Sequence, residues 1–171
     1  MSGMAWVRML IGAVWLNGAL EKLLNPNFAQ QFATSLNAGG FIAVAPRWFQ
    51  DIMRAFVVPN AELAAQLARF GELTLGLTLL LGLLTNPAAV GSIFMSLTIM
   101  FSQGLPRFGT GLGSPEFLNV NLVMALLSLI VLFSPGAKDF SLDASLARAR
   151  PRLSPLLVNR RRVGRRGGSR A

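Results

Sequence analysis

The residues in this sequence that could do chemistry are a few charged side chains at the ends of long apolar stretches. Glu21 and Lys22 close the first stretch, and Arg69 and Glu72 lie in the opening turns of the second. Arg69 and Glu72 are three residues apart, so on a helix they share a face and can pair. Lys22 is the other cation available to the carboxylates. A charge at the centre of a membrane helix costs about 2.5–3.5 kcal/mol, so these groups are expected to face one another inside a bundle.

Amide side chains fall in the same layer and complete a predicted polar pocket. Glu21 and Glu72 are its candidate catalytic, proton-handling groups, and the candidate ligand-binding residues are Asn17, Lys22, Arg69, Gln103, Asn119 and Asn121. Asn119 and Asn121 are two residues apart, so at most one of them is expected to point fully inward. Such a pocket beside lipid suits a quinone headgroup or a small anion. The alternative is that these groups only join helices through hydrogen bonds worth about 0.6 kcal/mol each on average.

Three residue types that carry much of redox and metal chemistry are missing. The sequence has no Cys, no His and no Tyr. A thiolate nucleophile, an iron–sulfur cluster and imidazole ligation of haem or metal are therefore excluded. We expect no metal and no covalently bound cofactor, so redox chemistry requires a diffusible cofactor such as a quinone, or a partner subunit.

The composition predicts a membrane protein with a separate basic tail. Of the 171 residues 53% are hydrophobic and 13% charged, and the mean hydropathy is +0.53. Soluble domains average roughly 25% charged residues. Residues 1–137 hold six basic and five acidic side chains, whereas residues 138–171 hold ten basic and two acidic ones, so most of the net charge of +9 lies in the last fifth of the chain.

Four apolar stretches predict an all-α antiparallel bundle of four transmembrane helices in residues 1–145, with spans at about 4–24, 62–84, 88–103 and 117–133. The first is interpreted as a retained helix in preference to a signal peptide. Thr85-Asn86-Pro87 is too short for anything but a hairpin link, with Pro87 opening the next helix. Four spans and the arginine-rich tail favour a bacterial inner-membrane protein with both termini in the cytoplasm.

The long loop 25–61 is expected to hold two amphipathic helices. Asn25-Pro26 resembles an N-cap with Pro at the first helical position, opening a helix to about Leu36. Pro46 opens a second helix with one apolar face, made by Phe49, Ile52, Met53, Phe56 and Val57. This segment is an interfacial cap, with or without a ligand beneath it. The glycines of 109–113 predict a flexible turn, because a phosphate-binding loop requires a preceding strand and a following Lys.

The segment 146–171 is predicted to be a disordered cytoplasmic tail, since it is rich in Arg, Gly and Pro. Its arginines are expected to bind anionic lipid headgroups or partner subunits. Nucleic acid is disfavoured as a partner because no aromatic residues alternate with the basic ones. The predicted docking residues are Arg148, Arg150, Arg152, Arg160, Arg161, Arg162, Arg165 and Arg166.

Three segments resemble the DoxX family of small bacterial membrane proteins, which is similar to DoxD, a membrane component of thiosulfate:quinone oxidoreductase. The first runs from Trp15 to Lys22 and continues with Asn25-Pro26; the second includes Gly71-Glu72-Leu73 and residues 80–89; the third is residues 136–143, ending in Ser-Leu-Asp. The resemblance covers about residues 5–145. It implies a four-helix membrane bundle associated with redox or sulfur-metabolism complexes, with Glu21, Lys22 and Glu72 at the family's polar positions.

These observations lead to three hypotheses about function. The first is an accessory, structural subunit of a membrane electron-transfer complex that contributes to a quinone or lipid site. The second is a quinone-reducing subunit of a thiosulfate:quinone oxidoreductase-like enzyme, with Glu21 and Glu72 handling protons and Arg69 and Lys22 orienting the substrate. The third, a small-solute transporter, ranks last because the sequence has no evident inverted repeat or broken helix.

Overall fold

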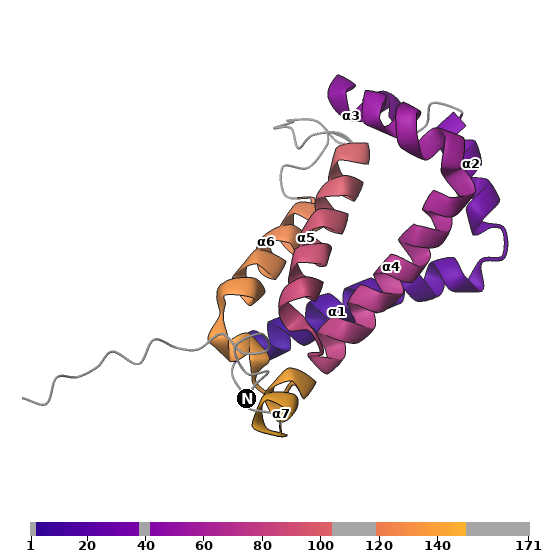
Figure 1. Ribbon diagram of the computed structural model, residues 1–171. Coiled ribbons are helices and arrows are strands. Elements are labelled where there is room, and N and C mark those ends of the chain that lie inside the picture. Colours follow the sequence, from indigo (N-terminus) through magenta and orange to yellow (C-terminus); the bar gives the residue numbers. More distant parts are fainter. Residues whose placement is uncertain (1–2, 38–41, 104–118, 150–171) are drawn as a thin grey trace, which may run out of the picture.

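The computed structural model describes residues 3–37, 42–103 and 119–149, which form helices and no strand (Figure 1). The main helices are α1 (Gly3–Leu24), α2 (Phe28–Asn37), α3 (Arg47–Ile52), α4 (Ala61–Leu81), α5 (Thr85–Ser102), α6 (Val120–Phe133) and α7 (Leu142–Ala149). Short turns of helix lie at Ile42–Val44, Met53–Val57, Val58–Asn60 and Pro135–Lys138. The prediction of an all-α fold is confirmed.

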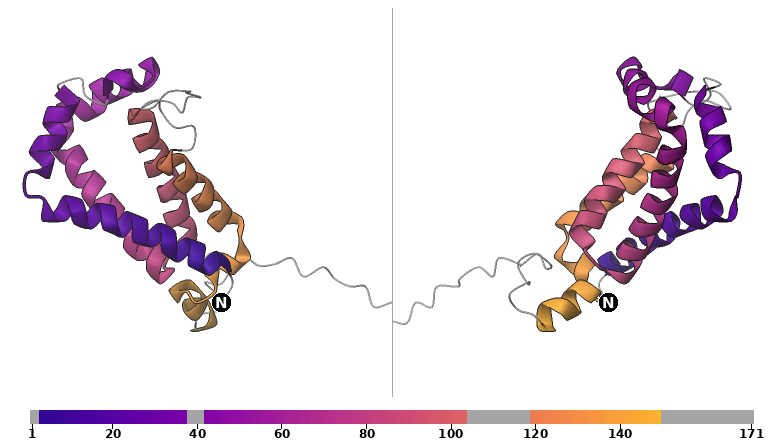
Figure 2. Two further views of the ribbon diagram at one scale, coloured as in Figure 1. Left: turned by 180° about the vertical axis from the view of Figure 1, so that it is seen from behind. Right: turned by 45° about the vertical axis from the view of Figure 1, so that its right-hand side comes forward.

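Two helix pairs build the body of the molecule. α1 packs along α4, and α5 packs along α6, whereas α4 and α5 meet near their connection and diverge away from it (Figures 1 and 2). Glycines let α1 and α4 touch: a Cβ on Gly12 would lie 2.6 Å from Leu80 N, and one on Gly76 would lie 2.7 Å from Leu16 N. Small residues bring membrane helices into close backbone contact in this way.

One described helix, α1, is long and apolar enough to cross a membrane, and α6 is apolar but shorter. The bounds of α1 and α4 lie within three residues of the first two predicted spans, at 4–24 and 62–84. α5 ends within a residue of the third predicted span, and α6 ends where the fourth was predicted to end. The number of spans stays a prediction.

The predicted link at Thr85-Asn86-Pro87 is wrong, because these residues form the first turn of α5. The chain instead reverses over Gly82–Leu84, where Gly82 has φ +66° and Leu84 has φ +50°. Both oxygens of Asp143 hold this turn from a distant part of the chain, accepting hydrogen bonds of 2.8 Å from Leu84 N and Thr85 N. A cap supplied by a residue 58 positions later is invisible to reasoning from local sequence.

The described residues between α1 and α4 are largely helical, as predicted, but two details differ. α2 begins at Phe28 rather than after Asn25, because Asn25 Oδ1 accepts from Asn27 N at 3.0 Å and holds Pro26 in a turn. The predicted apolar face of the second helix is divided: Phe49 and Met53 are buried, while Phe56 is exposed. A wider, π-type turn at Met53–Val57 shifts the face by part of a turn.

The segment predicted as a tail begins with ordered structure. α7 runs to Ala149, so the helix extends four residues beyond the predicted bundle boundary at 145. Arg148 is exposed and donates to Ser145 Oγ at 3.2 Å. The other predicted docking arginines, and the glycines of 109–113, lie outside the described residues.

Gly82→Ala is expected to destabilise the fold severely. A Cβ on Gly82 would overlap the guanidinium of Arg8, which is completely buried against this glycine, and Ala tolerates φ +66° poorly. The strain at positive φ alone costs about 1 kcal/mol. Thermal unfolding in mild detergent, followed by Trp fluorescence, measures the loss.

Gly3→Ala is the matched control, because a Cβ there has no neighbour within 4 Å. Equal unfolding midpoints for the Gly82→Ala and Gly3→Ala proteins would contradict the close approach of Arg8 to Gly82.

Candidate functional site

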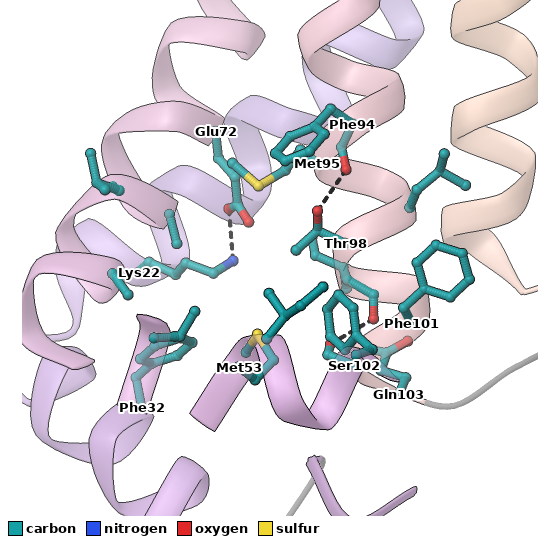
Figure 3. Close-up of a pocket in the computed structure, with 18 of the residues that line it drawn as sticks. Lys22, Phe32, Met53, Glu72, Phe94, Met95, Thr98, Phe101, Ser102 and Gln103 are labelled. Atoms are coloured by element: carbon teal, nitrogen blue, oxygen red, sulfur yellow. Dashed lines mark hydrogen bonds and ion pairs between the residues drawn. The ribbon is translucent and has the colours of Figure 1, made fainter. Parts of the chain in front are cut away.

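A cavity of about 830 Å³ lies where α4 and α5 diverge (Figure 3). α3 and the turn after it close its wide end, and α2 and the last turns of α1 contribute to the wall. Leu67 on α4 and Phe94 on α5 line the cavity although they are 64% and 73% exposed, so it opens on the flank of the helices. Ligand pockets in proteins commonly enclose about 300–1,000 Å³, so this one is large enough for a cofactor.

The lining is mainly apolar and aromatic. Its apolar members are Phe28, Phe32, Trp48, Phe49, Ile52, Met53, Val57, Ala64, Leu67, Ala68, Phe94, Met95, Leu97, Ile99 and Phe101. Thr98 and Ser102 also line it, but each hydroxyl donates to a carbonyl of its own helix, to Phe94 O at 2.9 Å and Ile99 O at 2.7 Å. The charged groups of the lining are Lys22 and Glu72.

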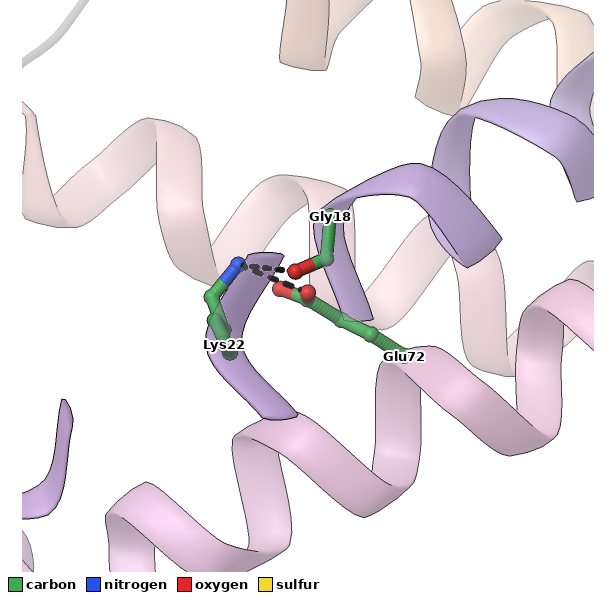
Figure 4. A network of polar contacts seen from close by, with 3 residues as sticks. All are labelled: Gly18, Lys22 and Glu72. Atoms are coloured by element: carbon green, nitrogen blue, oxygen red, sulfur yellow. Dashed lines mark hydrogen bonds and ion pairs between the residues drawn. The ribbon is translucent and has the colours of Figure 1, made fainter. Parts of the chain in front are cut away.

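Lys22 and Glu72 form an ion pair between α1 and α4 (Figure 4). Lys22 Nζ lies 2.7 Å from Glu72 Oε2 and donates to Gly18 O at 3.3 Å. The Glu72 side chain is 4% exposed and that of Lys22 is 27% exposed. Gly18 makes room for the pair, since a Cβ there would sit 3.0 Å from Glu72 Oε2. The carboxylate is thus buried, and the ammonium faces the cavity.

Arg69 does not pair with Glu72, so the predicted Arg69–Glu72 contact is wrong. The guanidinium Cζ of Arg69 lies 5.4 Å from the centre of the Phe28 ring, and Lys22 Nζ lies 5.9 Å from the same centre. Cations within about 6 Å of an aromatic ring are attracted to its face. Phe28, in the wall of the cavity, therefore has two cations close to its ring, and the partner of Glu72 comes from the neighbouring helix.

The amides gather at the end of α5, next to the cavity. Asn119 Nδ2 and Asn121 Nδ2 donate to Gln103 Oε1 at 3.4 and 3.2 Å. Gln103 lines the cavity, while neither asparagine does. Both asparagines reach the same group because Asn119 caps α6 from outside the helix, accepting from Asn121 N at 2.6 Å.

Neither Asn17 nor Glu21 lines the cavity, which contradicts their predicted place in the pocket, and both side chains are exposed. Successive residues on a helix point about 100° apart, so turning Lys22 towards α4 turns Glu21 away from it. Glu72 remains the buried carboxylate of the candidate site. The sequence prediction also missed the aromatic lining, which includes Trp48 and Phe101. Their helical spacing alone does not distinguish a cavity wall from packed core.

Comparison with known families identifies the chain. The family described as TQO small subunit DoxD matches residues 4–155. The chain belongs to the DoxD family. DoxX, the family that the sequence was found to resemble, is close to DoxD but not identical to it. Membership of the DoxD family implies that the chain is a membrane protein. No curated protein and no solved structure matches it.

Lys22→Met is expected to destabilise the DoxD-family chain more than the double variant Lys22→Met/Glu72→Gln. Removing the cation leaves Glu72 buried without its partner, which costs about 3–5 kcal/mol in a fully buried pair and less here because Lys22 is partly exposed. Neutralising Glu72 as well removes that cost. Unfolding of the purified protein in detergent gives the two free-energy changes.

Glu21→Gln serves as the control, since Glu21 is exposed and adjacent to Lys22; its effect should stay within about 0.5 kcal/mol. A double variant that is as unstable as the sum of its parts would show that Lys22 and Glu72 do not interact.

Proposed function

We propose that this chain is the small membrane subunit of a thiosulfate:quinone oxidoreductase-like complex, and that it is accessory to the subunits that receive the electrons. Its family membership supports this role. The sequence supports it as well, because a chain without Cys, His or Tyr has few groups of its own to carry electrons. Partner subunits in the membrane therefore supply the redox centres.

We further infer that α1, α4, α5 and α6 all cross the bacterial inner membrane. Large apolar side chains on all four helices are exposed, as expected of surfaces solvated by lipid: Trp6, Leu10, Val14 and Leu20 on α1; Leu63, Leu67, Phe70 and Leu77 on α4; Val90 and Phe94 on α5; Leu126, Leu129, Ile130 and Phe133 on α6. The start of α1 lies beside α7, which agrees with an even number of spans (Figure 1). The arginine-rich tail supports a cytoplasmic location for this end.

The observation that carries the functional proposal is the apolar cavity with a single ion pair in its wall. A quinone has an apolar ring and tail, and two carbonyl oxygens that accept hydrogen bonds. The aromatic and Met side chains suit the ring, and the opening beside Leu67 and Phe94 gives the tail access to lipid. Lys22 Nζ is a donor available to a carbonyl oxygen, and the amide of Gln103 also lines the cavity.

Two roles for the chain at this quinone site differ in what Glu72 does. In the accessory role the cavity only holds the quinone, while a partner subunit delivers both electrons and protons. In the second candidate role, quinone reduction within this chain, two electrons from the partner and two protons convert the quinone to a quinol. Glu72 is then the group that exchanges protons, because it is the carboxylate in the cavity wall.

The membrane-subunit proposal predicts that the chain migrates within a larger complex at fixed stoichiometry. Extraction of native membranes in a mild detergent, followed by sizing and identification of the co-migrating proteins, is the measurement. Migration of the chain by itself, at every detergent concentration that keeps other membrane complexes intact, would reject the subunit role.

Ala68→Trp is expected to remove bound quinone from the purified complex by filling the cavity, with the complex otherwise assembled. Ala68 lines the cavity, whereas Phe70, two residues along α4, is 54% exposed and does not line it. Phe70→Trp is therefore the matched control and should retain quinone at the wild-type ratio. Extraction of quinone per mole of complex, quantified by absorbance, is the readout.

Equal quinone content in the two Trp variants would place the quinone elsewhere. If the cavity is the site, Glu72→Gln separates the two roles. Turnover lost in an assembled complex that still retains quinone assigns proton exchange to Glu72, and unchanged turnover leaves the accessory role.

A further inference from the structure

A second cluster of buried charge lies at the opposite end of α4 and α5 from the cavity. Arg8 on α1 is 0% exposed, Lys138 after α6 is 3% exposed, and Asp143 at the start of α7 is 1% exposed. The cluster surrounds the Gly82–Leu84 turn that joins α4 to α5. The quinone cavity does not use any of these groups.

The cluster contains more positive than negative charge. Asp143 interacts electrostatically with both Arg8 and Lys138, but it is one carboxylate facing two cations. Both of its oxygens already accept backbone hydrogen bonds, from Leu84 N and Thr85 N. The first turn of α5 adds further positive potential at this point, because helix N-termini carry partial positive charge.

Several donors in the cluster have no acceptor among the described residues. Arg8 Nη2 donates to Phe140 O at 3.2 Å, but Arg8 Nε, Arg8 Nη1 and Lys138 Nζ make no hydrogen bond. Burial lowers the pKa of Lys138, while the nearby Asp143 opposes this shift. Buried cations are normally paired and hydrogen-bonded, so an anion with several oxygens would supply the acceptors that these donors lack.

We propose that Arg8 and Lys138 form a binding site for a phosphate-type oxyanion, free in solution or carried by a lipid headgroup. The planar guanidinium offers two N–H groups to two oxygens, and the ammonium offers a third contact from another side. A single bound oxyanion would balance the excess cation and supply the missing acceptors.

Phe140, whose carbonyl covers Arg8, is an exposed residue of a segment otherwise held by hydrogen bonds, and it gives the oxyanion a way in. The carbonyl oxygen of Phe140 accepts the hydrogen bond from Arg8. The Phe140 side chain is 72% exposed, and its backbone has φ +51°. A non-glycine residue in this conformation is strained. An arriving oxyanion replaces the carbonyl of Phe140 as acceptor for Arg8, so the segment moves without breaking the bonds from Asp143 to the turn.

The test compares wild-type protein with Lys138→Met, using thermal unfolding of the full chain in lipid-free detergent. Inorganic phosphate is titrated at constant ionic strength against chloride. The unfolding temperature of wild type is expected to rise by a few degrees as phosphate is added, because a ligand that binds only the folded state stabilises it. Lys138→Met is expected to lose this response and to unfold at a higher temperature than wild type without phosphate, since an uncompensated buried cation is gone.

Arg148→Gln is the matched control, as it removes an exposed cation at the same end of the molecule and should respond to phosphate like wild type. A second arm replaces phosphate by nanodiscs of phosphatidylglycerol or phosphatidylcholine. A response to phosphate assigns a free oxyanion, and a response that only lipid produces assigns a headgroup. The proposal is overturned if neither phosphate nor lipid stabilises wild type. It is also overturned if either probe raises the unfolding temperature of Lys138→Met as much as that of wild type. Poor folding of Lys138→Met without phosphate overturns it too, because the lysine is then a paired structural group.

Discussion

The architecture depends on how one carboxylate, Asp143, satisfies the backbone of a tight turn elsewhere in the chain. Gly82 and Leu84 both have positive φ, and the first N–H groups of α5 have no partner within the helix. Asp143 accepts from two of these groups, while its own N–H donates to Gly82 O at 3.0 Å. This closes one end of the α4–α5 pair firmly. The helices can therefore separate at the other end, and that separation is the cavity.

The cavity contains a charged pair for which stability alone is a weak explanation. Burying a lysine and a glutamate costs desolvation energy that their attraction often does not exceed, and apolar replacements of the same size can be equally stable. The Glu72 side chain is 4% exposed, and the absence of a side chain at Gly18 on α1 leaves the space that its carboxylate occupies. In the proposed function, this pair in a mainly apolar wall serves to recognise the ligand.

Sequence reasoning found what depends on local pattern and missed what depends on contacts across the chain. Long apolar stretches located α1 and α4 closely, because burial and lipid exposure impose a periodic pattern. Two cations were available to Glu72, and spacing along one helix favoured the wrong one: Arg69 lies on the same helical face, but Lys22 from α1 forms the ion pair. Glu21 was assigned to the pocket on composition, although only the rotation of α1 about its axis decides whether residue 21 or 22 faces α4. The cap by Asp143 was not foreseeable for the same reason.

The two polar clusters lie at opposite ends of the molecule, and the core between them limits how protons could move. It is mainly apolar, with Ile11, Leu79 and Met124 among its members. Its polar groups include a short hydroxyl chain, in which Trp15 Nε1 donates to Ser92 Oγ at 2.7 Å and Ser92 Oγ lies 2.8 Å from Ser128 Oγ. These contacts join α1, α5 and α6 and include neither Glu72 nor Arg8, so they pack helices rather than link the two clusters. If Glu72 exchanges protons with a quinone, they reach it from the open end near Lys22, which in the proposed topology faces away from the cytoplasm.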